Sequence, residues 1–281
     1  VECDFRGYQP FTTGRCEYNH AESVDNIRCV VDVVGAECDG KSAFLIHTSP
    51  YIRRNHGDIF YTCESYLAIW RRAVAQGGEL GIHLHEEEPN GSCLYYGYPS
   101  HIRKVISGHV RMLSDAGLIA TCESTGYSGL NEWFLPIMEE NGLFVNLDNV
   151  GQFTQYTVRD WSCAPTDTYF FDYTDLFREG NSKVLSVPLG MVAGCRGEDG
   201  LVLRGNSLRY LKSLWKEIDK EKPVESTSLM RVDVDVIAQD ERKLVKFLRW
   251  MRRIGGEFVT PSEVYREHAA KHFVVEEADN S

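Results

Sequence analysis

The sequence lacks a C-x-x-C pair, even though nine of its 281 residues are cysteine. Zinc ribbons bind their metal through cysteine pairs of that spacing, so a zinc ribbon is unsupported. Nine is also an odd number, and a complete set of disulfides would leave one thiol over. We therefore predict reduced and mostly buried cysteines, as in cytoplasmic proteins. The cysteines are Cys3, Cys16, Cys29, Cys38, Cys63, Cys93, Cys122, Cys163 and Cys195.

Long apolar runs are absent as well. No stretch approaches the roughly 18 residues that a membrane-spanning helix needs. The N-terminus also lacks a basic segment followed by an apolar one, which is the pattern of a signal peptide. These absences predict a cytoplasmic protein without a membrane span. The sequence begins at Val1 rather than Met, so a signal peptide removed before Val1 stays an open alternative.

Positive charge is scarce, because 30 Lys and Arg stand against 41 Asp and Glu and give a net charge of -11. A surface that follows nucleic-acid phosphates needs clustered Lys and Arg. The two basic segments, 103–111 and 249–253, are diluted by apolar residues at helical spacing. We therefore predict no nucleic-acid partner, and the sequence gives no indication of the oligomeric state.

Apolar periodicity predicts about seven strands, each followed by a helix. The expected strands are 1–5, 42–49, 79–85, 118–124, 144–148, 183–190 and 229–236, with a closing strand within 256–260. The expected helices cover 23–37, with Ser23 as its cap, then 66–74, 102–113, 131–143, 207–220 and 240–255, and a last one begins at Pro261. Segments 6–22, 50–60 and 150–182 are expected to be irregular.

Such alternation predicts a parallel sheet with helical crossovers, and therefore a barrel or a doubly wound sheet. No linker, repeat or change of composition divides the chain, so we expect one domain over 1–281. In both architectures the ligand site lies at the carboxyl ends of the strands.

The segment GELGIHLHEEE, 78–88, places two histidines at one such strand end. If the strand continues, His83 and His85 point to the same face and suit two ligands of one Zn²⁺. If a helical turn begins at once, Glu87 becomes the second ligand. The alternative without metal is two histidines bonded to neighbouring carboxylates. Glu86 and Glu88 are expected to be solvated.

Two further strand ends carry paired carboxylates, Glu2 with Asp4 and Asp233 with Asp235. Carboxylates on the inner face of a barrel are costly without a cation, which favours a functional site. The alternatives are a solvated edge strand for the first pair and a salt bridge to Arg231 or another basic neighbour for the second. His47 also ends a strand, but a lone histidine is more typical of a structural role.

The ordered set of segments resembles the polysaccharide deacetylase superfamily, that is, carbohydrate esterase family 4 and its relatives. VECDF resembles the opening acidic strand, SAFLIHTS the second strand, and GGELGIHLHEEE the histidine motif. CESTGYSGLNEWFLPIMEENGL resembles the third motif, and RDWSCAP, VLSVPLG and GGEFVTPSEV match later segments in type and order. The resemblance implies a distorted seven-stranded (β/α)7 deacetylase-type barrel.

Several motifs depart from the family pattern. Glu2 and Asp4 stand where the family pairs two aspartates, and Glu87 stands where it has its second histidine. The arginine of the third motif falls near Glu123, which reverses the charge. The late strand that carries a histidine in the family corresponds to 233–235 and has none.

The resemblance implies a metal-dependent hydrolase that removes an acyl group, such as acetyl, from an amino-sugar nitrogen in a glycan or glycan precursor. It implies Asp4 and His83 as ligands of a divalent metal, Zn²⁺ first, with His85 or Glu87 as the third ligand. The implied catalytic residues are Glu2 as base, Asp4, and Asp235 as the acid.

The implied sugar contacts are Tyr127, Trp161 and Asp233. Trp161 belongs to an aromatic-rich stretch, 160–177, that is equally typical of a packed loop. The alternative function is a catalytically degenerate domain that binds glycans or acts as an interaction module, and the charge changes at Glu123 and 233–235 favour it.

Overall fold

A computed structural model gives the fold of the chain. It describes residues 1–5, 8–9, 15–58, 60–88, 94–150, 159–191, 200–222 and 227–279.

The centre of the molecule is a seven-stranded sheet in the order β1-β4-β5-β6-β7-β9-β8. All neighbouring strands run parallel except β8 and β9, which are antiparallel. The strands are β1 Glu2–Cys3, β4 Ala43–Thr48, β5 Glu79–Leu84, β6 Ala120–Thr125, β7 Val145–Asn146, β8 Tyr169–Phe170 and β9 Leu185–Ser186. A separate antiparallel pair is formed by β2 Tyr8–Gln9 and β3 Arg15–Cys16.

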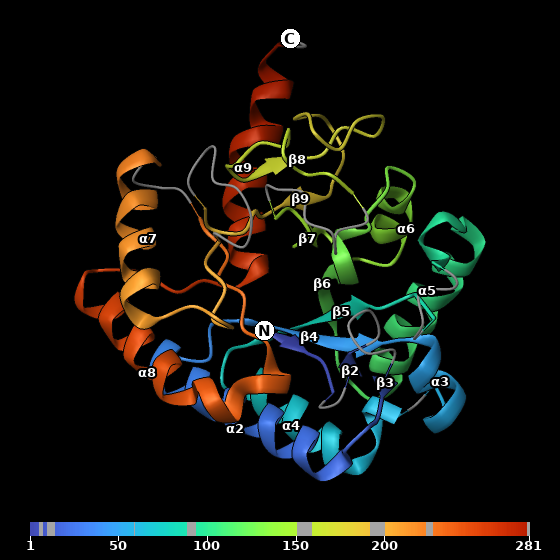
Figure 1. Ribbon diagram of the computed structural model, residues 1–281. Coiled ribbons are helices and arrows are strands. Elements are labelled where there is room, and N and C mark those ends of the chain that lie inside the picture. The colour runs from blue at the N-terminus through green and yellow to red at the C-terminus, as the bar shows by residue number, and fades with distance from the viewer. Residues whose placement is uncertain are drawn as a thin grey trace.

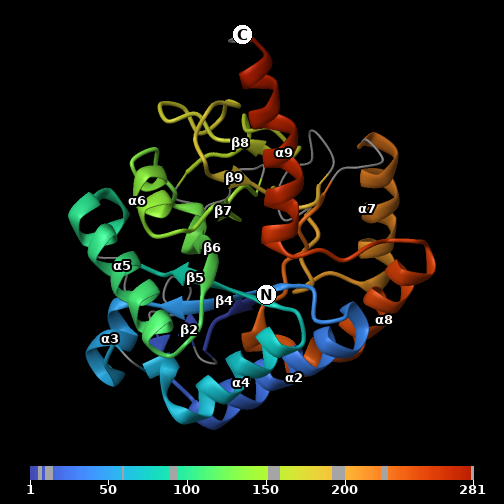
Figure 2. The same cartoon turned by 180° about the vertical axis from the view of Figure 1, so that it is seen from behind.

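Helices surround this sheet, as Figure 1 shows, with α2 between α4 and α8, and α7 beside α8. Figure 2 shows the other side, where α9 lies against β6 and β7. The helices are α2 His20–Cys38, α3 Pro50–His56, α4 Glu64–Ala75, α5 Pro99–Asp115, α6 Phe134–Glu140, α7 Leu208–Glu221, α8 Ile237–Arg253 and α9 Pro261–Asp279. Short 3-10 turns are η1 Phe60–Thr62, η2 Tyr95–Gly97, η3 Gly126–Ser128 and η4 Val234–Val236.

Helix α2 illustrates how the apolar period fixes a helix. Its residues Val24, Ile27, Val31 and Val34 are buried, as their spacing predicts. The helix begins earlier than expected, because the cap is Asn19, whose side chain accepts a hydrogen bond from the Glu22 amide. Ser23 lies inside the first turn and donates its hydroxyl to the Asn19 carbonyl at 2.7 Å.

The sheet packs through both faces, and this decides where the polar strand ends lie. One face joins the helices in a large core that contains Phe44, Ile46, Leu80, Ile82 and Leu84. The other face forms a smaller cluster with Val264 of α9, and contains Ala43, Leu45, Cys122, Val145 and Leu185. Because side chains alternate along a strand, His47, His83 and His85 lie on the side of this smaller cluster.

Helix α9 begins at the amino ends of β4 and β5. The backbone N–H and hydroxyl of Ser262 donate to Glu79 at 3.1 and 2.9 Å, and Lys41 pairs with Glu263. The carboxyl ends of the same strands, which carry the histidines, therefore lie at the opposite end of the sheet from the start of α9.

The expected late strand 229–236 is reduced to single bridges and a turn. Leu229 bridges Leu189, Arg231 bridges Val202, and Asp233 bridges Glu2 of β1. Residues Val234–Val236 then form η4. The structure therefore shows a mostly parallel seven-stranded sheet in an α/β fold. The segment 229–233 bridges Glu2 of β1 and Leu189, which follows β9, but these single bridges do not form a continuous ladder that closes the sheet.

Four other expectations about secondary structure were wrong. Segment 150–182 was expected to be irregular but contains β8. Segment 50–60 was expected to be irregular but contains α3, because Ser49 accepts a hydrogen bond from the Ile52 amide and Pro50 occupies the first turn. Segment 6–22 contains the β2–β3 pair and the start of α2. Residues 256–260 form no strand.

Six cysteines within the described residues are free thiols. Cys3, Cys38 and Cys122 are buried and Cys29 is half-buried, whereas Cys63 and Cys163 are exposed. Burial is thus less general than expected, and Cys16, Cys93 and Cys195 lie outside the side chains that the structure describes. Across the described chain, no helix combines the length and the apolar character that crossing a membrane requires.

Candidate metal centre

Asp4, His83 and His85 come together at the carboxyl ends of β1 and β5. One nitrogen or oxygen atom of each residue lies within 4.8 Å of the corresponding atoms of the other two. His83 Nε2 is 3.7 Å from Asp4 Oδ1, and His85 Nε2 is 3.6 Å from Asp4 Oδ2. These separations exceed a hydrogen bond, so both imidazole edges face one carboxylate without closing on it.

The strand geometry explains why both histidines face Asp4. The pairing of β5 with β4 continues past its last residue, because the His85 amide donates to the Thr48 carbonyl at 2.8 Å. His83 and His85 therefore share one face of an extended strand, which is the first of the two arrangements considered from the sequence. The helical turn that would have brought Glu87 toward the cluster does not form.

His47 holds Asp4 in place from the neighbouring strand. Its Nδ1–H donates to Asp4 Oδ1 at 2.8 Å, and its ring stacks on that of His85 at 4.9 Å. Burial opposes ionisation of Asp4, but the charge of the nearby His85 and the hydrogen bond from His47 hold the pKa of Asp4 well below its ordinary value. A role for His47 beside the site was the less favoured interpretation of the sequence.

The two strand histidines differ in charge. Burial, reinforced by the charge of His85, lowers the pKa of His83 well below its ordinary value, so its ring is neutral. For His85, the carboxylates of Glu87 and Asp4 outweigh burial and raise the pKa to about 10. A neutral imidazole is the form that binds a metal, so His83 is ready to do so, whereas His85 must first release a proton.

Glu87 lies behind His85 rather than in the cluster. Its Oε1 accepts a hydrogen bond from His85 Nδ1 at 2.8 Å, and its Oε2 lies 2.9 Å from the Tyr96 hydroxyl. Within the described residues, the group whose donor atoms lie close enough to share an ion consists of Asp4, His83 and His85.

Glu2 lies beside His83, near the same Nε2 that faces Asp4, and is paired with Arg231. Arg231 Nη2 is 2.9 Å from Glu2 Oε2, and Glu2 Oε2 is 3.9 Å from His83 Nε2. Burial raises the pKa of Glu2 to about 7, although Arg231 opposes the rise. Sequence reasoning considered Arg231 only as a salt-bridge partner of 233–235 and missed its contact with Glu2.

The two late aspartates are each paired with an arginine. Arg231 donates to Asp233 Oδ1 at 2.8 Å, which is the salt bridge considered as an alternative. Asp233 is thereby placed next to Glu2, with which its backbone forms a bridge. Asp235 lies in η4 with Arg204 Nη1 at 3.4 Å, and the structure gives no contact between Asp235 and Asp4, His83 or His85 among the residues it describes.

Of the three predicted sugar contacts, Tyr127 is half-exposed, whereas Trp161 and Asp233 are buried. Tyr127 follows β6 in a left-handed conformation with φ 59°, and its ring meets His85 edge-on at 5.3 Å. Trp161 is fully buried and donates its indole N–H to the Ser128 carbonyl at 3.1 Å. Trp161 therefore supports the Tyr127–Ser128 turn and offers no free face to a sugar ring.

Glu86 was expected to be solvated, and this was wrong. Its side chain is fully buried, and both oxygens accept hydrogen bonds from Arg53 of α3 at 2.6 Å. His101 donates to Oε2 at 2.7 Å. Glu88 is partly exposed and accepts two hydrogen bonds at 2.8 Å from Arg54.

Glu123, at the position of the family's third-motif arginine, faces away from the cluster. It pairs with the β7 side chain of Asn146, which donates to Glu123 Oε2 at 2.8 Å. Burial and the neighbouring Asp148 raise the pKa of Glu123 well above its ordinary value. Glu123 is thus a buried acid of the helix-facing layer, where no cation pairs with it among the described residues.

Gly126 is required by the His85 ring. A Cβ at this position would lie well inside van der Waals contact with Nδ1 and Cε1 of His85. We expect Gly126→Ala to displace the ring from Glu87 and to lower Zn²⁺ affinity about 10-fold or more, measured by calorimetric titration. Gly108→Ala is the control, because a Cβ there meets nothing within 4 Å. Equal affinities for both variants would show that Gly126 has no such role.

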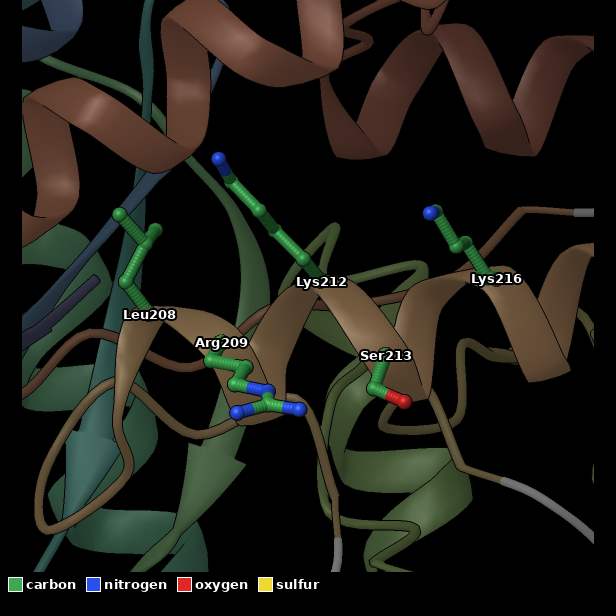
Figure 3. A pocket seen from close by; sticks show the side chains of 5 residues that line it. All are labelled: Leu208, Arg209, Lys212, Ser213 and Lys216. Atoms are coloured by element: carbon green, nitrogen blue, oxygen red, sulfur yellow. The ribbon is translucent and has the colours of Figure 1, made fainter.

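A hollow on the surface lies over α7 and contains none of these groups. Figure 3 shows the side chains that line it, which are Leu208, Arg209, Lys212, Ser213 and Lys216. The candidate centre is therefore defined by its donor atoms and not by this hollow.

No family model matches the sequence, and no curated protein matches it. Among solved structures, the fold is similar to the crystal structure of a "putative polysaccharide deacetylase from Mycobacterium smegmatis". The two share 11% sequence identity and a TM-score of 0.58, over 88% of this chain and 77% of that chain. At this identity the likeness shows a common α/β fold, which is the fold class expected from the alternation of strands and helices in the sequence.

Proposed function

We propose that the chain is a metal-dependent hydrolase that removes an N-acyl group from an amino sugar of a glycan or glycan precursor. The observation that carries the proposal is the convergence of Asp4, His83 and His85 at the carboxyl ends of parallel strands. The fold shared with a protein described as a polysaccharide deacetylase supports it.

The donor atoms suit a divalent cation, with Zn²⁺ as the first candidate. Two imidazoles and one carboxylate are a common protein ligand set of catalytic zinc, with a further position open. Donors about 2.0–2.1 Å from one tetrahedral ion are roughly 3.4 Å apart, close to the 3.6 and 3.7 Å found here. When bound, such an ion would polarise an amide carbonyl and lower the pKa of water.

Glu2 is proposed as the general base. Its carboxylate lies beside His83, so a water attacking a carbonyl at this end of the sheet can give Glu2 its proton. A pKa of about 7 leaves a substantial fraction of Glu2 ionised near neutral pH. Arg231 fixes the orientation of the carboxylate.

The leaving nitrogen must receive a proton, and two residues are considered as its donor. Asp235 is the residue implied by the family pattern, and Arg204 Nη1 lies 3.4 Å from its carboxylate. Glu2 can return the proton that it took from water, because its pKa permits both forms near neutrality. Tyr127, next to His85, and Asp233, next to Glu2, are the proposed sugar contacts.

The finer architecture is proposed on the same basis. The bridges from Leu229 to Leu189 and from Asp233 to Glu2 connect the segment 229–233 to both halves of the sheet. This supports a distorted (β/α)7 barrel in which that segment fills the gap. We propose that 1–281 forms one such domain.

Acetate release tests the function. Purified protein is stripped with a chelator, reloaded with Zn²⁺, and incubated with N-acetylglucosamine, its oligomers and a nucleotide-linked form. We expect acetate and free amine in equal amounts from at least one substrate, none after stripping, and recovery on reloading. Glu2→Gln should retain the metal and lose roughly 10²-fold or more of the turnover, whereas Glu88→Gln serves as the unaffected control.

The alternative is a glycan-binding module without hydrolysis, which the pairing of Asp233 and Asp235 with arginines favours. Zn²⁺-loaded protein that binds one of these sugars but releases no acetate from any of them supports this alternative and contradicts the hydrolase.

A further inference from the structure

We infer that Glu87 is a positioning residue that orients His85 for the metal, and that Tyr96 in turn fixes Glu87. The inference rests on the proposed metal site and assigns Glu87 a role different from that of a ligand.

The first step is the hydrogen bond between Glu87 and His85. Glu87 is 1% exposed, and its Oε1 accepts the His85 Nδ1–H at 2.8 Å. This bond keeps the proton on Nδ1, so that Nε2 is the nitrogen left to offer a lone pair. Nε2 is also the nitrogen that faces Asp4, at 3.6 Å from Oδ2. Glu87 thus selects the tautomer that the cluster needs.

The second step is the set of hydrogen bonds that the Tyr96 hydroxyl makes with the residues around His85. Tyr96 lies in η2, is 1% exposed, and its hydroxyl accepts the Glu86 amide N–H at 3.1 Å. The same hydroxyl is 2.9 Å from Glu87 Oε2 and 2.8 Å from the Leu84 carbonyl. One phenol therefore contacts the residue before His85, the residue after it, and the carboxylate that orients its ring.

The remaining sides of the His85 ring are also occupied. His47 stacks on one side at an interplanar angle of 25°, and Tyr127 meets the ring edge-on at 85°. Gly126 packs where a Cβ would overlap the ring. The ring therefore has little freedom to turn, and the orientation set by Glu87 is kept.

Three variants test the hydrogen-bonded chain from Tyr96 through Glu87 to His85, and Glu88→Gln is the matched control. Glu88 is the next carboxylate along the chain and pairs with Arg54 rather than with His85. Zn²⁺ affinity is measured by competition with a coloured chelator, and the visible spectrum of bound Co²⁺ reports the geometry of the ligands. We expect Glu87→Ala to weaken Zn²⁺ binding by about 10- to 100-fold and to change the Co²⁺ spectrum.

The conservative variants separate positioning from packing. Glu87→Gln keeps an oxygen that can accept the His85 Nδ1–H, so it should recover part of the affinity lost in Glu87→Ala and the parent Co²⁺ spectrum. Tyr96→Phe should weaken binding by about 10-fold, and Glu88→Gln should bind like the parent. A purely structural role would lower the unfolding midpoint of Glu87→Ala without changing metal affinity or the spectrum.

The outcomes distinguish this inference from the proposed function. Parent-like Zn²⁺ affinity in Glu87→Ala, Glu87→Gln and Tyr96→Phe contradicts the positioning role of Glu87, even if acetate is released. Weakened Zn²⁺ binding in these variants, together with no acetate release by the parent, supports the positioning role of Glu87 and contradicts the proposed hydrolase function. A parent protein that binds neither Zn²⁺ nor Co²⁺ overturns both.

Discussion

His83→Ala is expected to abolish tight Zn²⁺ binding, with a loss of about 100-fold or more, because it removes one of three donors. His83 is 2% exposed, and its Nε2 faces Asp4 at 3.7 Å. Its ring is neutral in the metal-free protein, so of the two imidazoles it is the one that requires no proton release. Calorimetric titration of the metal-free variant with Zn²⁺ measures the effect.

Two controls accompany this variant. His56→Ala removes an exposed histidine of α3 and should leave the affinity unchanged. Glu88→Ala removes a carboxylate of the same acidic run and should also bind like the parent, because Glu88 contacts Arg54 and Tyr95. If His83→Ala binds Zn²⁺ as tightly as these two variants, the cluster is not a metal site and the hydrolase proposal loses its basis.

The regular elements could be predicted where the apolar period is unbroken. The expected strands 42–49 and 79–85 correspond to β4 and β5, and the expected helix 207–220 corresponds to α7. In these segments, burial on one or both faces decides the conformation, and the period of the apolar residues records that burial directly.

Prediction failed where single polar contacts decide the structure. Helix α3 has the sequence PYIRRNH and little apolar period, so its cap at Ser49 is the main sign of it. The segment 229–236 has the apolar pattern of a strand, but in the structure it makes single bridges, and Arg231 pairs with Glu2 and Asp233.

In the site, too, the strand periodicity could be predicted from the sequence, but the polar contacts could not. The period of two along a strand predicts that His83 and His85 share a face, and the structure confirms this arrangement. The sequence does not reveal which partner each carboxylate finds, because the partners come from distant segments. Glu86 and Arg53 are 33 residues apart in the chain, and Glu123 meets Asn146 across two strands.

Arg53→Met is expected to lower the free energy of unfolding by about 3 kcal/mol, because it leaves the buried Glu86 carboxylate without its main partner. The side chain of Glu86 is fully buried and that of Arg53 is 18% exposed. His101 retains one hydrogen bond to Glu86, which places the expected loss at the lower end of the range for a broken buried pair. Urea denaturation followed by circular dichroism measures it.

The neighbouring pair offers a matched control with the same chemistry at the surface. Arg54 donates two hydrogen bonds to Glu88, but these side chains are 53% and 21% exposed. Water can solvate Glu88 when Arg54 is removed, so Arg54→Met should cost no more than about 1 kcal/mol. The contrast between adjacent arginines isolates burial as the cause.

The double variant Arg53→Met/Glu86→Leu tests whether the unpaired charge of Glu86 causes the loss of stability. Removing both charges leaves no unpaired buried ion, and apolar replacements of a buried pair are often neutral. Most of the roughly 3 kcal/mol lost in Arg53→Met should therefore return. If Arg53→Met costs no more than Arg54→Met, or if the double variant is less stable than the single one, the Glu86 carboxylate does not depend on Arg53 in the way that its burial implies.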